Sequence, residues 1–152
     1  MDLKLAELPP LERYKLLLAL TRCTKIGFIS WPLAEGGYDP VAERVFNEIK
    51  VDALFLEYDT PRAGDFTPLR FFPKDKVLVL GLVSTKTPKL EDADALKRRI
   101  EEAAKYVDVD RLCISPQCGF SSNYLGNPVT IDDEKRKLEL VVKTAESVWG
   151  SA

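Results

Sequence analysis

The chain has 152 residues, of which 45% are hydrophobic and 30% are charged, and its formal net charge is −2. This composition is typical of one globular domain, and the nearly balanced charge argues against a nucleic-acid-binding surface. No apolar run approaches the about 20 residues that a membrane span requires, and the N-terminus lacks the apolar core of a signal peptide. The sequence contains no histidine, which excludes Ser-His-Asp and Cys-His catalysis and every metal site that depends on imidazole.

The first forty residues fit more than one secondary structure. Residues 15–23 and 25–31 each have the length and apolar content of a strand, while the stretch after Pro10 also fits a helix. A helix is expected to begin at Asp39, which is a good N-cap residue, because Pro40 suits the first helical position.

Three apolar runs further along the chain have the length of strands. They are continuous rather than alternating, as expected for strands buried on both faces of a parallel sheet. These runs are residues 53–58, 76–84 and 111–115. Two amphipathic helices are predicted near them, over residues 91–106 and about 131–148, the second with Thr130 as its N-cap.

Strands and helices therefore alternate about every 30 to 35 residues, which predicts an α/β fold with parallel strands and right-handed crossovers. Four such units amount to about half of a (β/α)₈ barrel, whose usual length is about 250 residues. An open doubly wound sheet is the alternative, but the glycine-rich turn that usually follows its first strand is absent. We expect residues 1–152 to form a single domain.

Polar side chains gather at the C-terminal ends of the predicted strands, where active sites lie in both architectures. These ends are Thr21-Arg22-Cys23, Glu57-Tyr58-Asp59, Ser84-Thr85-Lys86 and Gln117-Cys118-Gly119. The thiols of Cys23 and Cys118 and the carboxylate of Glu57 are thus expected on one rim. Thiolates and a carboxylate are acceptable zinc ligands, and three protein ligands leave a fourth position for substrate.

Each of these residues also has a structural interpretation. An isolated cysteine is most often a small buried hydrophobe, and Cys113, inside an apolar run, is expected to be one. Cys118, in the turn after that run, and Cys23, in the ambiguous region, stay open between the two roles. Glu57 interrupts an apolar run, so it lies either at a strand mouth or beside a hydrogen-bond donor.

Cysteine number also bears on the compartment. Three cysteines are an odd number, and they lack the spacing of a disulfide framework. This pattern is typical of a reducing compartment, with free or metal-bound thiols. We therefore expect a cytoplasmic protein.

A more specific signal comes from two stretches, LEYDTPRAGDFTPLRFFPKDKVLVLGLVSTKTPKLED and LCISPQCGFSS. They resemble the C-terminal catalytic barrel of cobalamin-independent methionine synthase and its shorter relatives. The likeness extends over about residues 33–149, whereas residues 1–32 match poorly. The family fold is a (β/α)₈ barrel, similar to that of uroporphyrinogen decarboxylase, so the resemblance implies that the chain forms roughly the C-terminal half of a TIM-type barrel.

The resemblance also implies a zinc site. In the family, zinc is held by a His-x-Cys pair, by a glutamate at a strand end and by the cysteine of a Pro-x-Cys-Gly turn. Cys118, in the turn 116–119, matches the turn cysteine, and Glu57 matches the glutamate. Cys23 is placed on the cysteine of the pair, where Thr21 stands in place of the histidine.

The activity implied by the resemblance is that of a zinc-dependent S-methyltransferase. Such an enzyme transfers a methyl group from a folate-type donor to a thiol such as homocysteine, which zinc binds as a thiolate. A metal-bound thiol is deprotonated outright, so histidine is not needed as a proton acceptor. No residue besides the three ligands is assigned a catalytic or substrate-binding role, because the chain lacks the preceding half of the barrel.

Two alternatives stay open. The chain could be a non-catalytic half-barrel, either a truncated paralogue or a part that assembles with another chain. It could also be a metal-free enzyme of the decarboxylase kind, which would clamp carboxylates with Arg62 and Arg70. A half-barrel leaves open strand edges and an apolar inner face, which natural proteins cover. We therefore expect a homodimer or a complementary half-barrel chain, and no nucleic-acid or membrane partner.

Overall fold

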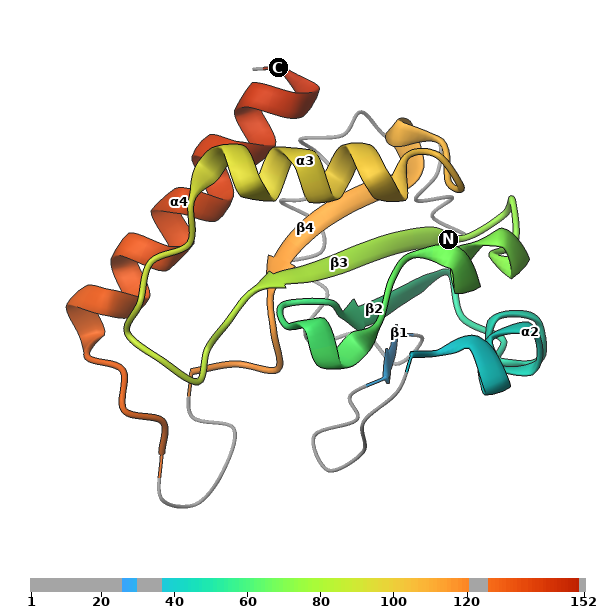
Figure 1. Cartoon of the computed structure of the whole chain (residues 1–152), viewed down its shortest axis with the longest axis horizontal. Helices are drawn as coiled ribbons and strands as arrows, with labels where there is room; N and C mark the ends of the chain where they lie inside the picture. Colours follow the sequence, from blue (N-terminus) through green and yellow to red (C-terminus); the bar gives the residue numbers. More distant parts are fainter. Residues whose placement is uncertain (1–25, 30–36, 121–125, 151–152) are drawn as a thin grey trace, which may run out of the picture.

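The structure of the chain is a computed structural model that describes residues 26–29, 37–120 and 126–150. In these ranges it contains one sheet of four parallel strands in the order β1-β2-β3-β4. The strands are β1 (Ile26–Ile29), β2 (Ala53–Glu57), β3 (Val77–Val83) and β4 (Leu112–Pro116). The helices are α2 (Asp39–Glu48), α3 (Ala93–Ala103) and α4 (Ile131–Trp149), with short 3₁₀ turns η3 (Pro61–Ala63), η4 (Thr67–Phe71) and η5 (Val109–Arg111). The predicted α/β fold of parallel βα repeats is confirmed (Figure 1).

Some of the elements and site residues predicted from the sequence lie outside these ranges. The elements expected over residues 15–23 and after Pro10 lie outside the described residues, as do Thr21 and Cys23. The expected strand over residues 25–31 does contain β1. The other three strands each lie within two residues of their predicted bounds, because continuous apolar runs mark buried parallel strands clearly.

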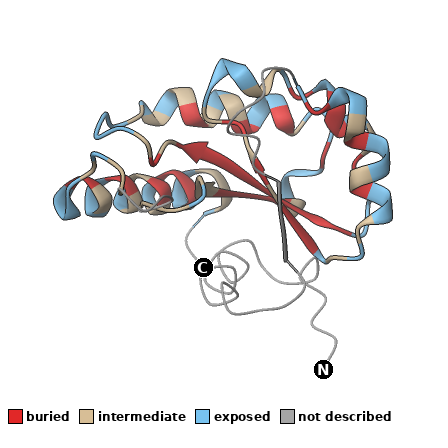
Figure 2. Ribbon diagram, turned by 90° about the horizontal axis from the view of Figure 1, so that it is seen from below, coloured by how far each residue is buried: buried red, intermediate tan, exposed pale blue. Residues whose placement is uncertain are grey.

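The two faces of the sheet bury different side chains. Side chains alternate along a strand, and on β2 Leu54 and Leu56 belong to the large core that also includes buried residues of α2, α3 and α4. Phe55 packs on the opposite face, against a second, smaller cluster. The described helices therefore cover one face of the sheet, as in the wall of a barrel, and Figure 2 shows the strands buried while the helices expose one side.

The second cluster forms the inner face of the sheet. Its members are Ala53, Val77, Val79 and Cys113. All of them are at most 3% exposed in the single chain. This layer therefore does not present the exposed apolar face that the sequence analysis expected of a half-barrel. The expectation that Cys113 is a buried structural residue is confirmed.

The helix ends follow local sequence signals, with one exception. α4 begins after Thr130, whose side chain accepts from the Asp133 backbone in a capping box, so the predicted cap is confirmed. The predicted N-cap of α2 is wrong, because Tyr38 holds the cap position and Asp39 is already helical. The Asp39 carboxylate instead accepts a hydrogen bond from Arg70 at 2.6 Å. No helix in the described ranges has both the length and the apolar content to cross a membrane.

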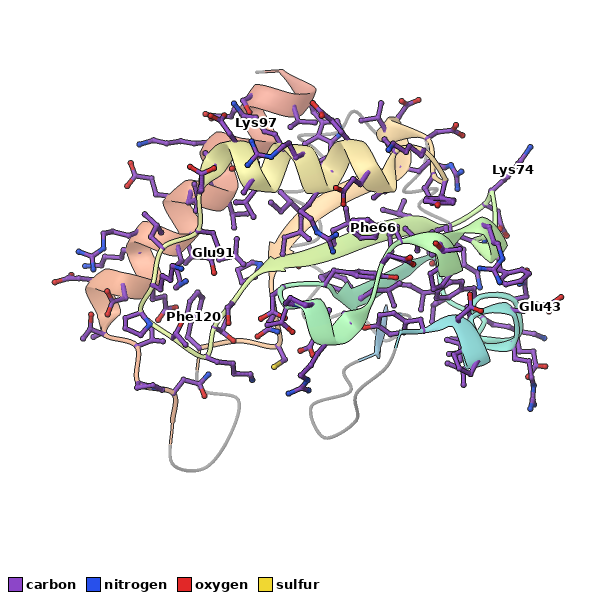
Figure 3. All side chains as sticks on the ribbon, viewed as in Figure 1. Glu43, Phe66, Lys74, Glu91, Lys97 and Phe120 are labelled. Atoms are coloured by element: carbon purple, nitrogen blue, oxygen red, sulfur yellow. The ribbon has the colours of Figure 1, made fainter. Side chains whose placement is uncertain are left out.

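A buried lysine of α4 fixes the loop between β3 and α3. The Lys137 side chain is 0% exposed and its Nζ donates to Glu91 Oε2 at 2.9 Å and to the Lys89 carbonyl oxygen. Glu91 Oε1 in turn accepts from the backbone N–H of Ser84 at 2.9 Å. Figure 3 shows Glu91 on this loop, next to α4. Because Ser84 is the first residue after β3, Lys137 holds in place the start of the loop that carries Lys86.

Replacing Lys137 with methionine should destabilise the chain, because Glu91 would keep a largely buried charge without its cation. The expected loss is at the lower end of about 3–5 kcal/mol, since Glu91 is still 22% exposed. Lys143→Met is the matched control on the same helix, because its ion pair with Glu139 is exposed on both sides and should contribute less than about 1 kcal/mol. Urea denaturation measures both losses. Equal losses for the two variants would contradict the role assigned to Lys137.

Candidate metal centre

Glu57 lies at the C-terminal end of β2, on the inner face of the sheet. It follows Phe55 by two residues, so strand alternation places both side chains on the face away from the helices. Glu57 Oε1 is buried and has no hydrogen-bond partner in the described part of the chain. Leaving a buried carboxylate oxygen unsatisfied costs free energy. The position therefore favours a cation or a hydrogen-bond donor at this oxygen.

Gly81 keeps the space beside Glu57 open. It pairs with Glu57 on β2 and with Ser115 on β4, so the three residues form one row across the sheet. A Cβ at Gly81 would lie 3.1 Å from the Leu56 carbonyl oxygen, and 3.6 Å from both Glu57 Cα and the Pro116 carbonyl oxygen. Since 3.1 Å is tighter than nine in ten real Cβ contacts and the neighbour is a backbone atom, the close approach of the strands favours glycine here.

Cys118 lies in the turn after β4. The turn starts with a hydrogen bond from the Gln117 N–H to the Val83 carbonyl oxygen at 3.0 Å, and Gly119 has a φ of 103°, which favours glycine. Cys118 is exposed and free, so it is not the small buried hydrophobe of the structural interpretation. Lys86 Nζ lies 3.1 Å from its sulfur. The thiol is therefore open to solvent and has an ammonium group beside it.

Glu57 and Cys118 lie at the same end of the sheet, with β3 between their strands. Parallel strands run about 4.8 Å apart, so this rim spans about 10 Å from β2 to β4. The described residues contain no group of three or more His, Cys, Asp or Glu side chains that could hold a metal ion. Two of the three predicted ligands are placed on one rim, while Cys23 lies outside the described residues. Coordination of one ion by these ligands stays a prediction.

Other polar groups at the rim were not assigned a role by sequence reasoning. Burial raises the pKa of Asp59; a hydrogen bond from Ser84 opposes this shift, and the negative charge of Glu57 adds to it. Within the described ranges, several buried oxygen atoms at these strand ends lack a hydrogen-bond partner. Besides Glu57 Oε1, they are Asp59 Oδ2, Thr85 Oγ1 and Gln117 Oε1. The rim is thus rich in acceptors, which suits a cation or a ligand with several donors. The only signal in the sequence for a role of these polar residues was their position at the ends of predicted strands.

Tyr38 is a residue at the rim that the sequence analysis missed altogether. Its side chain is buried, and its hydroxyl lies 3.1 Å from both the N and the O of the Glu57 backbone. Burial raises the pKa of Tyr38 to about 12, so the hydroxyl stays protonated near neutral pH. A tyrosine just before a helix carries no pattern that would indicate such a contact.

Comparison with known proteins identifies the family of the chain. The family model described as "Cobalamin-independent synthase, Catalytic domain" matches residues 39–146. The protein YxjG of Bacillus subtilis (strain 168) is 53% identical over 117 residues, which make up 76% of this chain and 31% of YxjG. The chain therefore spans about a third of the length of this curated relative.

Comparison with solved structures identifies the fold. A candidate vitamin-B12-independent methionine synthase from Listeria monocytogenes matches 92% of this chain with 41% of its own, at 34% identity and a TM-score of 0.56. A B12-independent methionine synthase from Shewanella sp. W3-18-1, in complex with selenomethionine, matches 73% of this chain with 30% of its own, at 22% identity and a TM-score of 0.60. Because the chain matches only part of each barrel, the prediction that it forms a portion of a TIM-type barrel is confirmed.

Substituting Gly81 with alanine should destabilise the chain and disturb the rim, because the new Cβ would press on the Leu56 carbonyl oxygen. Overpacking of this kind costs about 1–3 kcal/mol. Gly37→Ala is the control, since a Cβ there has its closest neighbour at 3.4 Å, and we expect a change within about 0.5 kcal/mol. Thermal and urea unfolding compare the two variants. A Gly81→Ala protein as stable as Gly37→Ala would show that the strands do not approach as closely as described.

Proposed function

The chain belongs to the family of cobalamin-independent synthase catalytic domains, and we propose that it carries the metal-binding rim of a zinc-dependent S-methyltransferase. The reaction transfers a methyl group from a folate-type donor to a thiol such as homocysteine. One observation carries the proposal. Glu57 Oε1 is buried without a hydrogen-bond partner in the described part of the chain, at the same sheet end as the exposed thiol of Cys118.

The donor chemistry of the rim fits zinc. Cysteine sulfur and carboxylate oxygen are both ordinary zinc ligands, and a cation would satisfy the buried oxygen of Glu57. Cys23 is the third ligand in the proposal, on the strength of its position in the sequence alone. When bound, zinc acts as a Lewis acid that holds a substrate thiol as the thiolate at neutral pH.

The chain's own residues shape the place where the thiol would bind. Phe55 and Val79 lie on the inner face, two residues ahead of Glu57 and Gly81 along their strands. An apolar layer therefore lies next to the rim, on the side of the strand interiors, and limits the access of water. The ammonium group of Lys86 lies beside Cys118, where it offsets part of the negative charge of a thiolate and a carboxylate. The absence of a side chain at Gly81 leaves room between the two ligands.

The metal-free alternative is less well supported by the structure. It relies on arginines that are available to bind carboxylates of a substrate. Arg70 Nη1 already donates to Asp39 at 2.6 Å and to the Thr67 carbonyl oxygen at 3.0 Å, and its guanidinium lies 4.2 Å from the centroid of the Phe71 ring. Arg70 is thus engaged within the chain, which weakens the metal-free alternative at one of its two arginines.

We further propose that the remaining part of the barrel comes from a partner, either a second copy or a complementary chain. β1 and β4 are the edges of the described sheet, and open edges are usually paired or covered. The exposed free thiol of Cys118 supports a reducing, cytoplasmic location.

Zinc content tests the proposed site. Purified protein should bind about one zinc per complete set of ligands, and Cys118→Ser and Glu57→Gln should each weaken binding by more than the about 10–100-fold that outer-shell changes cause. Cys113→Ser is the control: it places a hydroxyl in the core, so it should lower stability and leave zinc bound. Atomic absorption after dialysis against a chelator measures the metal. Equal loss from Cys113→Ser and Cys118→Ser, or no zinc in any protein, would overturn the site.

Sedimentation equilibrium at micromolar concentration tests the assembly. We expect an assembled mass above the 17.1 kDa of one chain, and methyl transfer to homocysteine only in the assembled form. A well-folded monomer without any concentration dependence would contradict the second-copy form of the proposal. Zinc binding without methyl transfer in every assembly would instead favour a non-catalytic half-barrel.

A further inference from the structure

The backbone of Glu57 is held by a side chain from another element. Among the described residues, β1 pairs with β2 as far as Ile29 and Leu56. The next N–H and C=O on β2 toward that edge belong to Glu57, because the Tyr58 N–H bonds to Gly81 on the other side. The Tyr38 hydroxyl serves both: it accepts from the Glu57 N–H at 3.1 Å and donates to the Glu57 carbonyl oxygen at 3.1 Å. One hydroxyl thus continues the hydrogen-bond ladder beyond the described pairing with β1.

Both the backbone and the side chain of Tyr38 are held in place. Its carbonyl oxygen accepts from the N–H groups of Val41 and Ala42 in the first turn of α2. Its ring packs against Tyr58, with the ring centroids 5.2 Å apart, and the residue is 7% exposed. A side chain held in this way has little freedom to move, so the backbone it contacts is held as well.

We propose that Tyr38 is a positioning residue for the candidate zinc ligand Glu57. By fixing the N–H and C=O of Glu57, the Tyr38 hydroxyl sets the direction in which the Glu57 carboxylate leaves the end of β2. Groups that orient a metal ligand typically change metal affinity about 10–100-fold when they are removed. This inference rests on the proposed function for its link to zinc, but the contact to the Glu57 backbone can be tested without metal.

Tyr58 provides a matched control. It is also a buried tyrosine, 2% exposed, and its ring contacts that of Tyr38. Its hydroxyl, however, has no hydrogen-bond partner among the described residues. Removing the hydroxyl from either residue makes the same chemical change in the same cluster, yet only the change at Tyr38 releases the backbone of Glu57.

The experiment compares Tyr38→Phe, Tyr58→Phe and the unchanged full chain. The first measurement is amide hydrogen exchange of metal-free protein, in which exchange at the Glu57 N–H should accelerate at least about tenfold in Tyr38→Phe only. The second is the affinity for Zn²⁺, measured by competition with a chromophoric chelator. It should fall about 10–100-fold in Tyr38→Phe and change less than about twofold in Tyr58→Phe.

The outcomes separate this inference from the proposed function. Absence of Zn²⁺ binding by the unchanged chain would overturn the proposed function and the link to zinc, while exchange at Glu57 would still decide whether Tyr38 holds the backbone. Faster exchange with unchanged affinity for Zn²⁺ would reduce Tyr38 to a structural role and overturn the inference. Equal exchange in all three proteins would overturn it as well.

A second variant covers failure of Tyr38→Phe to fold. 4-Aminophenylalanine at position 38 keeps a donor for the Glu57 carbonyl oxygen but is a poor acceptor for its N–H. We expect a folded protein with faster exchange at Glu57 and weaker Zn²⁺ binding than the unchanged chain. Exchange and affinity equal to those of the unchanged chain would overturn the inference.

Discussion

The parallel register of β2, β3 and β4 is the constraint on which the candidate site depends. It sets Glu57, Gly81 and Ser115 in one row, so the ends of the three strands form a single rim. Because side chains alternate with a period of two, a slip of one residue on β2 would turn Glu57 toward the helices and a leucine toward the rim. The apolar layer that includes Val79 and Cys113 resists such a slip, since a slip would move its members out of the cluster.

Two helices reinforce this rim through single side chains. α2 places Tyr38 against the backbone of Glu57, and α4 reaches the loop after β3 through Lys137 and Glu91. That loop also brings Lys86 to Cys118. Both contacts join segments far apart in the sequence, so folding of the helices onto the sheet and ordering of the rim depend on one another. A barrel portion built in this way can present ligands on a rigid frame.

Sequence patterns predicted the elements whose signals are local. Continuous apolar runs marked three strands to within two residues, and Thr130 marked the start of α4. The position of Cys113 inside an apolar run predicted its burial, whereas the position of Cys118 in the following turn left its exposure undecided until the structure showed it. The prediction of Asp39 as the N-cap of α2 was wrong, because its carboxylate binds Arg70, 31 residues away. A local sequence pattern does not indicate such a distant pairing.

The contacts that fix the rim could not be predicted for the same reason. Tyr38 and Glu57 are 19 residues apart, and Lys137 and Glu91 are 46 residues apart; both pairs meet only through tertiary packing. The central claim is that Glu57 and Cys118 bind one metal ion, and X-ray absorption at the zinc edge of the loaded chain tests it most directly. The account predicts a mixed shell, with sulfur at about 2.3 Å and oxygen at about 2.1 Å, whose sulfur part shrinks in Cys118→Ser. A shell of oxygen and nitrogen alone would contradict it.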